Sequence, residues 1–282
     1  MSYRHIANLY REQQILLFRE CWASEKIHGT SAHVSWKEGK LNFFSGGSKM
    51  EQFLKLFNQE ELIKKFQELG HDEVVVFGEA YGGNMQGMSH TYGNKLLFVA
   101  FEVKIVDTWL DVSNAADVAG KLGLDFVPYR KISTDLVAID AERDLDSEQA
   151  IKNGMGPGHK REGIVLRPLV EMTLSNGERI IVKHKAEAFQ ETKKPRKVGE
   201  DLEVLSKADD VALEWVTDER LRHVLDALAC PVAMESTSAV IKGMIEDVKR
   251  EGEKEIVWSK DVERAIGTRG RVLFHKMAKE IK

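Results

Sequence analysis

The chain has 282 residues, of which 43% are hydrophobic and 30% charged, and its formal net charge is -4. These values indicate a globular protein with a core of its own and exclude a disordered chain. No apolar run approaches the roughly 18 residues of a membrane span, and the polar N-terminus is unlike a signal peptide. Cys21 and Cys230 lie far apart without a second pair, so we expect a reduced compartment, by default the cytoplasm.

The first 185 residues predict β-rich structure with a few helices. Turn-forming glycines separate short β-prone runs, a pattern typical of antiparallel strands. Strands are predicted at residues 20–26, 31–36, 41–44, 73–81, 95–110, 163–168 and 179–185. Residues 49–69 place apolar side chains at helical spacing before Gly70, and a short helix is predicted near 113–122, followed by a mixed stretch to about 155.

Beyond about residue 200, the β-branched runs give way to apolar residues at helical spacing, with Pro231 and Gly252 as separators. We therefore expect an α+β fold, with an antiparallel-β-rich domain over residues 1–195 and a small all-helical domain over residues 196–282.

Residues 183–197 carry six basic and two acidic side chains, and residues 260–282 carry seven basic and three acidic side chains. Phosphate contact would explain these patches, and so would solvated linker and helix faces.

Lys26 stands in the run SEKIHGT, directly after an apolar, β-prone stretch and three residues before Gly29. Apolar surroundings disfavour the charged form of a lysine, and the neutral amine is the nucleophile. The same Lys-x-x-Gly spacing recurs at Lys160 and Lys249, in charged surroundings typical of solvated turns. Lys26 is therefore the predicted nucleophile.

Four other runs place polar side chains at predicted strands. VFGEAYGG ends a strand at Glu79, although a capping glutamate would explain that residue alone. REGIVLRP puts Glu162 at the mouth of a buried strand, and KLLFVAFEV contains Phe101, which alone would be a core aromatic. Lys183 and Lys185 alternate onto one face of a strand, an expensive arrangement unless an anion such as a phosphate meets them.

In this order, EKIHGT, FGEAYGG, FVAFEV, EGIVLRP and VKHK resemble motifs I, III, IIIa, IV and V of the covalent nucleotidyltransferase superfamily. The resemblance is closest to the RNA ligase 2 family of phage and kinetoplastid editing enzymes, and it covers about residues 20–195. The glycine-rich residues 82–93 also resemble a segment of many RNA ligases. The resemblance implies a nucleotidyltransferase domain, ATP, Mg²⁺ or Mn²⁺, and RNA ends or a nicked RNA duplex as substrate. We expect no membrane association, and no obligate protein partner is evident from the sequence.

The resemblance also implies roles for individual residues. Lys26 would form a lysyl-adenylate with ATP, and Glu162, Lys183 and Lys185 would be the other catalytic residues. The implied nucleotide-binding positions are Glu25, Ile27, Gly29, Glu79, Phe101, Glu162, Lys183 and Lys185. Phe101 would stack on adenine. Glu25 would select the adenine edge through its side chain or its backbone, and Glu79 and Glu162 would recruit the metal.

One segment departs from the family pattern. These ligases usually carry an arginine after motif I that contacts phosphate, whereas the corresponding run FFSGGSK offers Gly46 and Gly47. Lys49 and the glycine backbone amides are the candidate replacements, because exposed amides bind anions.

Three alternatives share some of these features. A DNA ligase or a capping guanylyltransferase uses the same lysine chemistry, but those families typically follow the catalytic domain with a β-barrel domain, whereas residues 201–282 have helical patterns. A nucleic-acid-binding relative that has lost catalysis would keep the fold without labelling from ATP. A zinc enzyme is not indicated, because the chain has neither HExxH nor CxxC.

Overall fold

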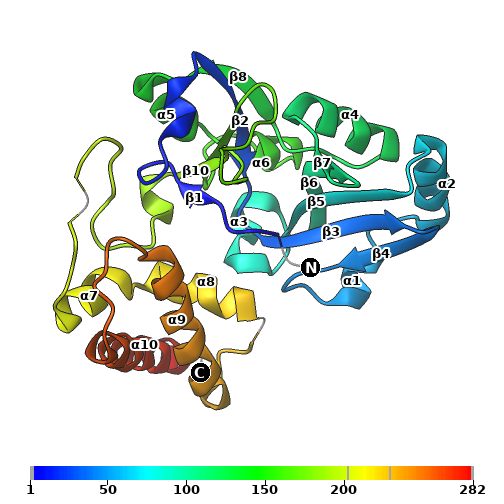
Figure 1. Ribbon diagram of the computed structural model, residues 1–282. Coiled ribbons are helices and arrows are strands. Elements are labelled where there is room, and N and C mark those ends of the chain that lie inside the picture. Colours follow the sequence, from blue (N-terminus) through cyan, green and yellow to red (C-terminus); the bar gives the residue numbers. More distant parts are fainter. Residues whose placement is uncertain (1–2, 202, 229, 281–282) are drawn as a thin grey trace. The chain divides into compact units, whose positions relative to one another are not determined.

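The computed structural model describes residues 3–201, 203–228 and 230–280. The chain divides into two compact units, Met1–Ala186 and Glu187–Lys282 (Figure 1). The division falls at Ala186 rather than near residue 195, because the segment after it contacts the helical unit. The Lys193 amide, for example, donates to the Glu214 carbonyl over 2.9 Å.

The described strands of the first unit form two five-stranded sheets. The first sheet has the order β1-β10-β9-β2-β8 and the second the order β4-β3-β5-β6-β7. Their bounds are β1 (Ala7–Asn8), β2 (Glu20–Lys26), β3 (Thr30–Lys37), β4 (Lys40–Phe44), β5 (Glu73–Gly82), β6 (Leu96–Ile105), β7 (Thr108–Trp109), β8 (Tyr129–Ser133), β9 (Gly163–Arg167) and β10 (Val182–Lys185). Neighbouring strands are antiparallel except β1 and β10, so the predicted antiparallel-β-rich α+β fold is confirmed.

The predicted helix over residues 49–69 is two helices. The described α-helices of this unit are α1 (Met50–Leu54), α2 (Gln59–Leu69), α3 (Ser89–Tyr92), α4 (Val112–Leu122), α5 (Leu136–Arg143) and α6 (Glu148–Lys152), and two short 3-10 helices cover Gln14–Leu17 and Met85–Gly87. Asn58 separates α1 from α2 because its side chain accepts a hydrogen bond from the Glu61 amide and starts a new helix. Gly70 ends α2 in the left-handed conformation, as a helix-terminating glycine does.

The second sheet carries its core on the face that α2 and α4 cover (Figure 1). Leu62 and Phe66 of α2 and Ala115 and Leu122 of α4 pack against the strands through a buried apolar cluster. This packing follows from the helical spacing of the apolar residues, which gives each helix one apolar face.

Two stretches of the first unit differ from their predicted structure. The run predicted as one strand over residues 95–110 turns at Val106, which has a φ of 52°, and continues as β7. The stretch left undivided up to residue 155 contains β8, α5 and α6, and β8 pairs with β2 at the edge of the first sheet. The sequence YRKIS of β8 has mostly exposed side chains, so it lacks the apolar alternation that reveals a strand.

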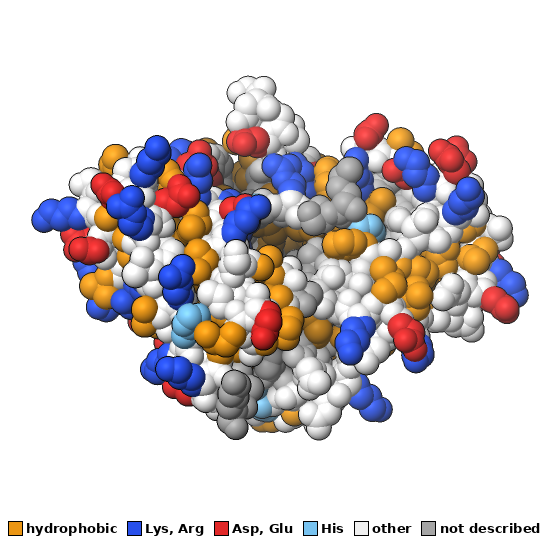
Figure 2. Space-filling view, turned by 90° about the horizontal axis from the view of Figure 1, so that it is seen from below, with side chains coloured by type: hydrophobic (Ala, Val, Ile, Leu, Met, Phe, Trp, Pro, Cys, Tyr) orange, Lys and Arg blue, Asp and Glu red, His pale blue; other side chains and the backbone are white. Residues whose placement is uncertain are grey.

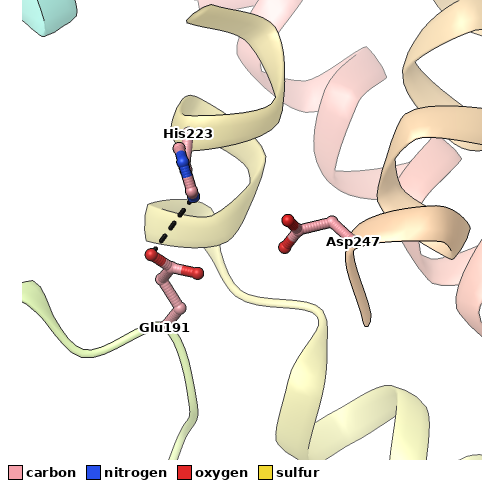
Figure 3. Close-up of side chains that lie close together, drawn as sticks. All are labelled: Glu191, His223 and Asp247. Carbon is pink, nitrogen blue, oxygen red and sulfur yellow. Dashed lines mark ion pairs between the residues drawn. The ribbon is translucent and has the colours of Figure 1, made fainter. Parts of the chain in front are cut away.

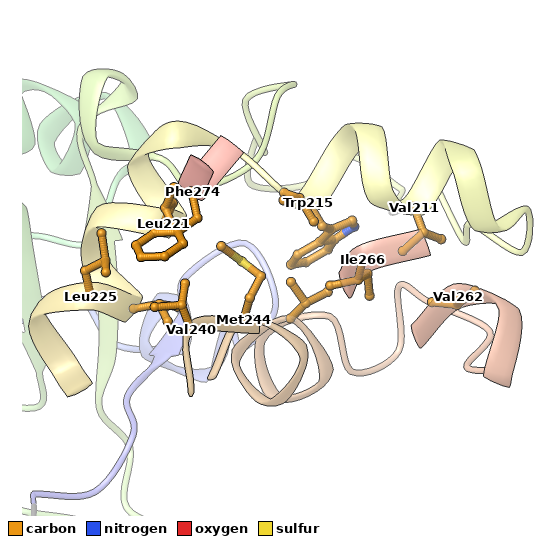
Figure 4. Close-up of a cluster of buried hydrophobic side chains, with 12 residues drawn as sticks. Val211, Trp215, Leu221, Leu225, Val240, Met244, Val262, Ile266 and Phe274 are labelled. Carbon is orange, nitrogen blue, oxygen red and sulfur yellow. The ribbon is translucent and has the colours of Figure 1, made fainter. Parts of the chain in front are cut away.

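The second unit is helical, as predicted. Its helices are α7 (Ala208–Trp215), α8 (Asp218–Leu228), α9 (Thr237–Glu251) and α10 (Lys260–Glu280). Their apolar faces meet in one core that includes Trp215, Leu221, Met244, Ile266 and Phe274 (Figure 4). None of the described helices in either unit is long and apolar enough to cross a membrane.

Candidate active site

Three neighbouring strands of the first sheet bring Lys26, Glu162 and Lys185 together. Lys26 of β2 pairs with Gly163 of β9, and Gly163 pairs with Lys185 of β10 on its other side. Glu162 directly precedes Gly163. The Lys26 Nζ donates to Glu162 Oε2 over 2.7 Å, and the Lys185 Nζ lies 3.1 Å from Glu162 Oε1. One carboxylate therefore lies between two lysine side chains.

The charge of Glu162 is fixed by these lysines. Its side chain is buried, and burial alone raises a carboxyl pKa, but Lys26 and Lys185 outweigh that effect and hold the pKa of Glu162 well below its usual range. Glu162 is thus an ionised carboxylate. The Lys26 side chain keeps 25% of its exposure, so the burial expected from the apolar run is only partial.

Glu79 belongs to β5 of the second sheet, and Gly29 lies in the turn that joins β2 of the first sheet to β3 of the second. A side chain on Gly29 would overlap the Ala80 carbonyl oxygen and the Glu79 side chain, so the close approach of the chain to β5 requires glycine. Burial raises the pKa of Glu79 to about 8, although Lys26 and a hydrogen bond from the Gly29 amide lower it. Lys26 lowers and Glu162 raises the pKa of Glu79, so carboxyl groups from both sheets act on the same lysine site.

His28 also belongs to this site, although the sequence interpretation assigned it no role. Its Nδ1 lies 3.5 Å from Glu162 Oε2, and its Nε2 lies 2.8 Å from Gln86 Oε1. Gln86 in turn donates to the Gly29 carbonyl over 2.9 Å. Burial lowers the pKa of His28 even though Glu162 raises it. Two features of the sequence could have identified His28 as a site residue. It lies in the same motif as Lys26, and its partner Gln86 lies in the glycine-rich segment.

The side chain of Glu25 points to helix α6. Its carboxylate accepts hydrogen bonds from Ser147 Oγ over 2.5 Å, the Glu148 amide over 2.9 Å and the Gln149 amide over 3.2 Å. Burial raises the pKa of Glu25, while Ser147 lowers it. These three donors occupy the carboxylate, so of the two predicted routes to adenine only the backbone of Glu25 agrees with the geometry. Ile27 is buried.

Phe101 lies in an aromatic group with Tyr3. Their ring centroids are 5.0 Å apart with the rings nearly perpendicular, and Tyr3 makes similar contacts with Phe77 and Trp109. These contacts are what a core aromatic would make. Stacking of Phe101 on adenine stays a prediction.

A buried ion cluster joins the motif strands β6 and β9. Glu102 of β6 contacts Arg167 of β9 through an oxygen–nitrogen distance of 3.0 Å and also pairs with Arg179. The Tyr3 hydroxyl donates to the same carboxylate over 2.5 Å, and Glu171 contacts both arginines. Since β6 belongs to the second sheet and β9 to the first, this cluster connects the two sheets.

Lys183 shares a strand face with Lys185, as the alternation predicted, but has a different neighbour. Its Nζ lies 3.3 Å from His5 Nε2, next to the point where β1 pairs with β10. The structure therefore brings Lys185 to Glu162 and Lys183 to the N-terminal segment.

The segment that lacks the family arginine contacts motif I directly. The Gly47 amide donates to Thr30 Oγ1 over 2.9 Å, so this amide is already used within the protein. Lys49 is exposed. Of the two predicted replacements, Lys49 is the one with a side chain open to a ligand.

One group of three metal-type side chains occurs among the described residues, and it lies in the helical unit. Glu191, His223 and Asp247 have ligand atoms within 4.8 Å of one another, and His223 Nδ1 lies 3.2 Å from Glu191 Oε1 (Figure 3). Arg220 pairs with Asp247 and lies 3.3 Å from Glu191. Arg250 also pairs with Asp247. The arginines already supply the positive charge that a metal would bring, so this group is an ion-pair network.

Comparisons with known proteins identify the family. The model of the family described as RNA ligase matches residues 19–185, which is more than half of the chain. The chain belongs to the RNA ligase family. The matched segment contains all five motifs, so the predicted resemblance is confirmed for the family. The comparison with curated protein sequences found no match.

Solved RNA ligase structures share the fold. A Naegleria gruberi RNA ligase variant with ATP and Mn aligns at 16% identity and a TM-score of 0.51, covering 67% of this chain and 56% of that one. A variant of the same ligase with AMP and Mn aligns at 16% identity and a TM-score of 0.53, and the ligase with PPi aligns at 17% identity and a TM-score of 0.52. Each alignment covers 67% of this chain and 57% of that one. The chain thus spans little more than half the length of these ligases.

Proposed function

We propose that this RNA ligase family member is an ATP-dependent RNA ligase that joins 3′-OH and 5′-phosphate ends through a lysyl-AMP intermediate. The observation that carries the proposal is the cluster of Lys26, Glu162 and Lys185 at the aligned ends of β2, β9 and β10. It supplies a nucleophilic amine, a second cation for phosphate and an ionised carboxylate within one small region. ATP, AMP, pyrophosphate and manganese in the Naegleria structures agree with this chemistry.

The first step forms the lysyl-adenylate. Lys26, whose side chain is 25% exposed, must release its proton to solvent, which ends the ion pair with Glu162, and its neutral amine then attacks the α-phosphorus of ATP. A nitrogen–phosphorus bond forms, the bond between the α- and β-phosphates breaks, and pyrophosphate leaves. Lys185 stays beside the reacting phosphates as a fixed positive charge, which stabilises negative charge that develops in the transition state.

A divalent cation fits the carboxylates of this site. Mg²⁺ and Mn²⁺ prefer oxygen ligands, and Mg²⁺ sites commonly use one or two carboxylates completed by substrate phosphates and water. Glu162, which is ionised, and Glu79 from the opposite sheet, which would release its proton when the ion binds, are the residues that would hold the ion. Such an ion would offset the charge of the phosphates and of pyrophosphate as it leaves.

The nucleoside contacts follow from the same strands. Phe101 would stack on adenine, the backbone of Glu25 and Ile27 would read the adenine edge, and Glu79 would lie near the ribose. Lys183 would contact phosphate from the strand face that it shares with Lys185. The occupied carboxylate of Glu25 supports its backbone as the recognition element.

The two later steps use RNA. The adenylate passes from Lys26 to the 5′-phosphate, and the 3′-hydroxyl then attacks that phosphate and releases AMP. Both ends must be held in line. We assign this task to the helical unit, whose exposed basic side chains include Arg264, Arg271, Lys276 and Lys279 of α10. Figure 2 shows basic and acidic side chains interspersed on one face of the molecule. Lys282, also predicted in this patch, lies outside the described residues.

Labelling tests the proposal most directly. With α-labelled ATP and Mg²⁺ or Mn²⁺, the full chain should acquire a covalent label that Lys26→Ala abolishes. Lys160→Ala and Lys249→Ala are matched controls, because both residues repeat the Lys-x-x-Gly spacing outside the cluster. Label that persists in Lys26→Ala, or that maps to either control lysine, would overturn the assignment.

A second assay tests the RNA steps separately. Matched nicks of RNA, DNA and mixed strands should show sealing that depends on RNA. The double variant Arg271→Ala/Lys276→Ala should bind RNA more weakly, with a flatter salt dependence, and should still label with ATP. Unchanged sealing and salt dependence in this variant would remove α10 from the RNA contact.

A further inference from the structure

The residues on both sides of Lys26 are hydrogen-bonded to one small framework, Glu25 through its side chain and His28 through its backbone amide. Residue 25 is bound through its carboxylate to Ser147 and the first amides of α6. The amide of His28 donates to the Tyr92 hydroxyl over 3.3 Å. Lys26 therefore lies between two attachment points that are only three residues apart in the chain.

The two attachment points are themselves connected through α6. Asn153, directly after α6, donates from Nδ2 to the Tyr92 carbonyl oxygen over 3.0 Å. Gln149 of α6 donates to the Tyr81 hydroxyl over 2.8 Å, and the rings of Tyr81 and Tyr92 meet edge to face at 5.2 Å. The hydrogen bonds close a ring that runs from Glu25 through α6 to Tyr92 and back to His28.

Most of this ring is shielded from water, while Asn153 and His28 are half-buried. Glu25, Ser147, Gln149, Tyr81 and Tyr92 are each at most 5% exposed. Buried hydrogen bonds of this kind are costly to break, because neither partner can turn to solvent. Helix α6 has only five residues, too few to be stable alone, so its place depends on such contacts.

We propose that Glu25 and Tyr92 are positioning residues that hold the Lys26 backbone at the attack geometry through the ring closed by α6. The inference rests on the proposed function, since it concerns the nucleophile of lysyl-AMP formation. It assigns the Glu25 carboxylate a task other than adenine recognition and gives Tyr92 a role in catalysis. Neither side chain touches the reacting atoms in this role.

The decisive variant is Tyr92→Phe, which removes a single hydroxyl and keeps the ring in the core. We expect lysyl-AMP formation to slow by about tenfold or more, because small misplacements of a reacting group cost rates of that order. The ATP concentration at half saturation should stay unchanged. Tyr129→Phe is the matched control, since that tyrosine packs its ring on Trp22 and Phe126 away from the ring of hydrogen bonds, and it should label at the wild-type rate.

The second variant is Glu25→Gln, which places an amide group against the donors of α6. It should also lower the rate, and the double variant Glu25→Gln/Tyr92→Phe should lose less than the product of the two single effects, because either change opens the same ring. If one of the two single variants does not fold, the other still tests the inference through its rate of lysyl-AMP formation per folded molecule.

Three results would count against the inference. A Tyr92→Phe protein that melts earlier yet labels at the full rate would reduce the hydroxyl to a stabilising role. Fully multiplicative effects would show that Glu25 and Tyr92 act independently. A wild-type protein that takes no label from ATP would overturn the proposed function and this inference together, whereas a fully active Tyr92→Phe variant overturns the inference alone.

Discussion

Removing the Glu102 carboxylate should destabilise the first unit strongly. Glu102 is 1% exposed, and the side chains of its partners Arg167 and Arg179 are 3% and 2% exposed. Glu102→Ala would leave two buried guanidinium groups short of one negative charge. It would also leave the Tyr3 hydroxyl without the acceptor that it now reaches over 2.5 Å.

The structure sets the expected magnitude. Breaking a buried ion pair by deleting one partner typically costs about 3–5 kcal/mol, because the remaining charge stays in a poorly solvating place. Glu171 still contacts both arginines after the change, with its Oε1 2.8 Å from Arg179 Nε, and partly compensates. We therefore expect about 3 kcal/mol, near the lower end of this range.

Urea unfolding of the full chain, followed by circular dichroism and tryptophan fluorescence, measures this loss. Trp109 should report it locally, since the Arg179 guanidinium lies 4.2 Å from its ring centroid. Glu51→Ala is the control, because its pair with Lys55 is exposed and should contribute nothing measurable. A Glu102→Ala protein within about 1 kcal/mol of the wild type would refute the reasoning, since a loss that small is typical of an exposed pair.

Three further outcomes follow from the site. Phe101→Ala should weaken ATP binding, measured by initial-rate labelling, by about 1–3 kcal/mol, the range for base stacking. Phe101→Tyr should have only a small effect on ATP binding. A Phe101→Ala protein that loses stability but keeps its affinity for ATP would instead favour a core role. Lys185→Ala should suppress labelling more than Lys183→Ala, because Lys185 contacts Glu162 whereas Lys183 contacts His5, and normal labelling in both would contradict this. The pKa of Glu79 is raised from 4.5 to about 8, so the folded state binds its proton more tightly and the free energy of unfolding should fall as pH rises across that interval. Glu79→Gln should flatten this dependence in urea titrations at several pH values, and an unchanged slope would argue against it.

Much of the fold was predictable because its signals are local. Strand β2 covers the predicted residues 20–26 and ends at Lys26, and Gly70 ends α2 because a left-handed backbone favours glycine. The features of the fold that the local pattern did not reveal depend on single side chains or on neighbouring segments in space. Asn58 divides one amphipathic stretch into two helices through one capping bond, and β8 is a strand because β2 pairs with it.

The residues of the candidate site were predictable from the sequence, but the residues that they contact were less so. The motifs identified Lys26, Glu162 and Lys185, which the sheet register brings together. The same motif pattern could not show that the Glu25 side chain turns to α6, because Ser147 lies 122 residues away in sequence. Contacts of that kind depend on tertiary structure, which one sequence does not show.

The placement of the lysines follows from strand geometry. Strand pairing fixes residues opposite one another, so Lys26 and Lys185 face Gly163 from its two sides, and Glu162 precedes that glycine by one position. Two ammonium groups so close would repel one another without a shared anion. Glu162 is that anion here, and the phosphates of ATP carry the charge that would take its place beside the lysines. In the proposed reaction, the same carboxylate that pairs with both lysines would then be released to bind a cation, so Glu162 would act both in the resting site and in the reacting one.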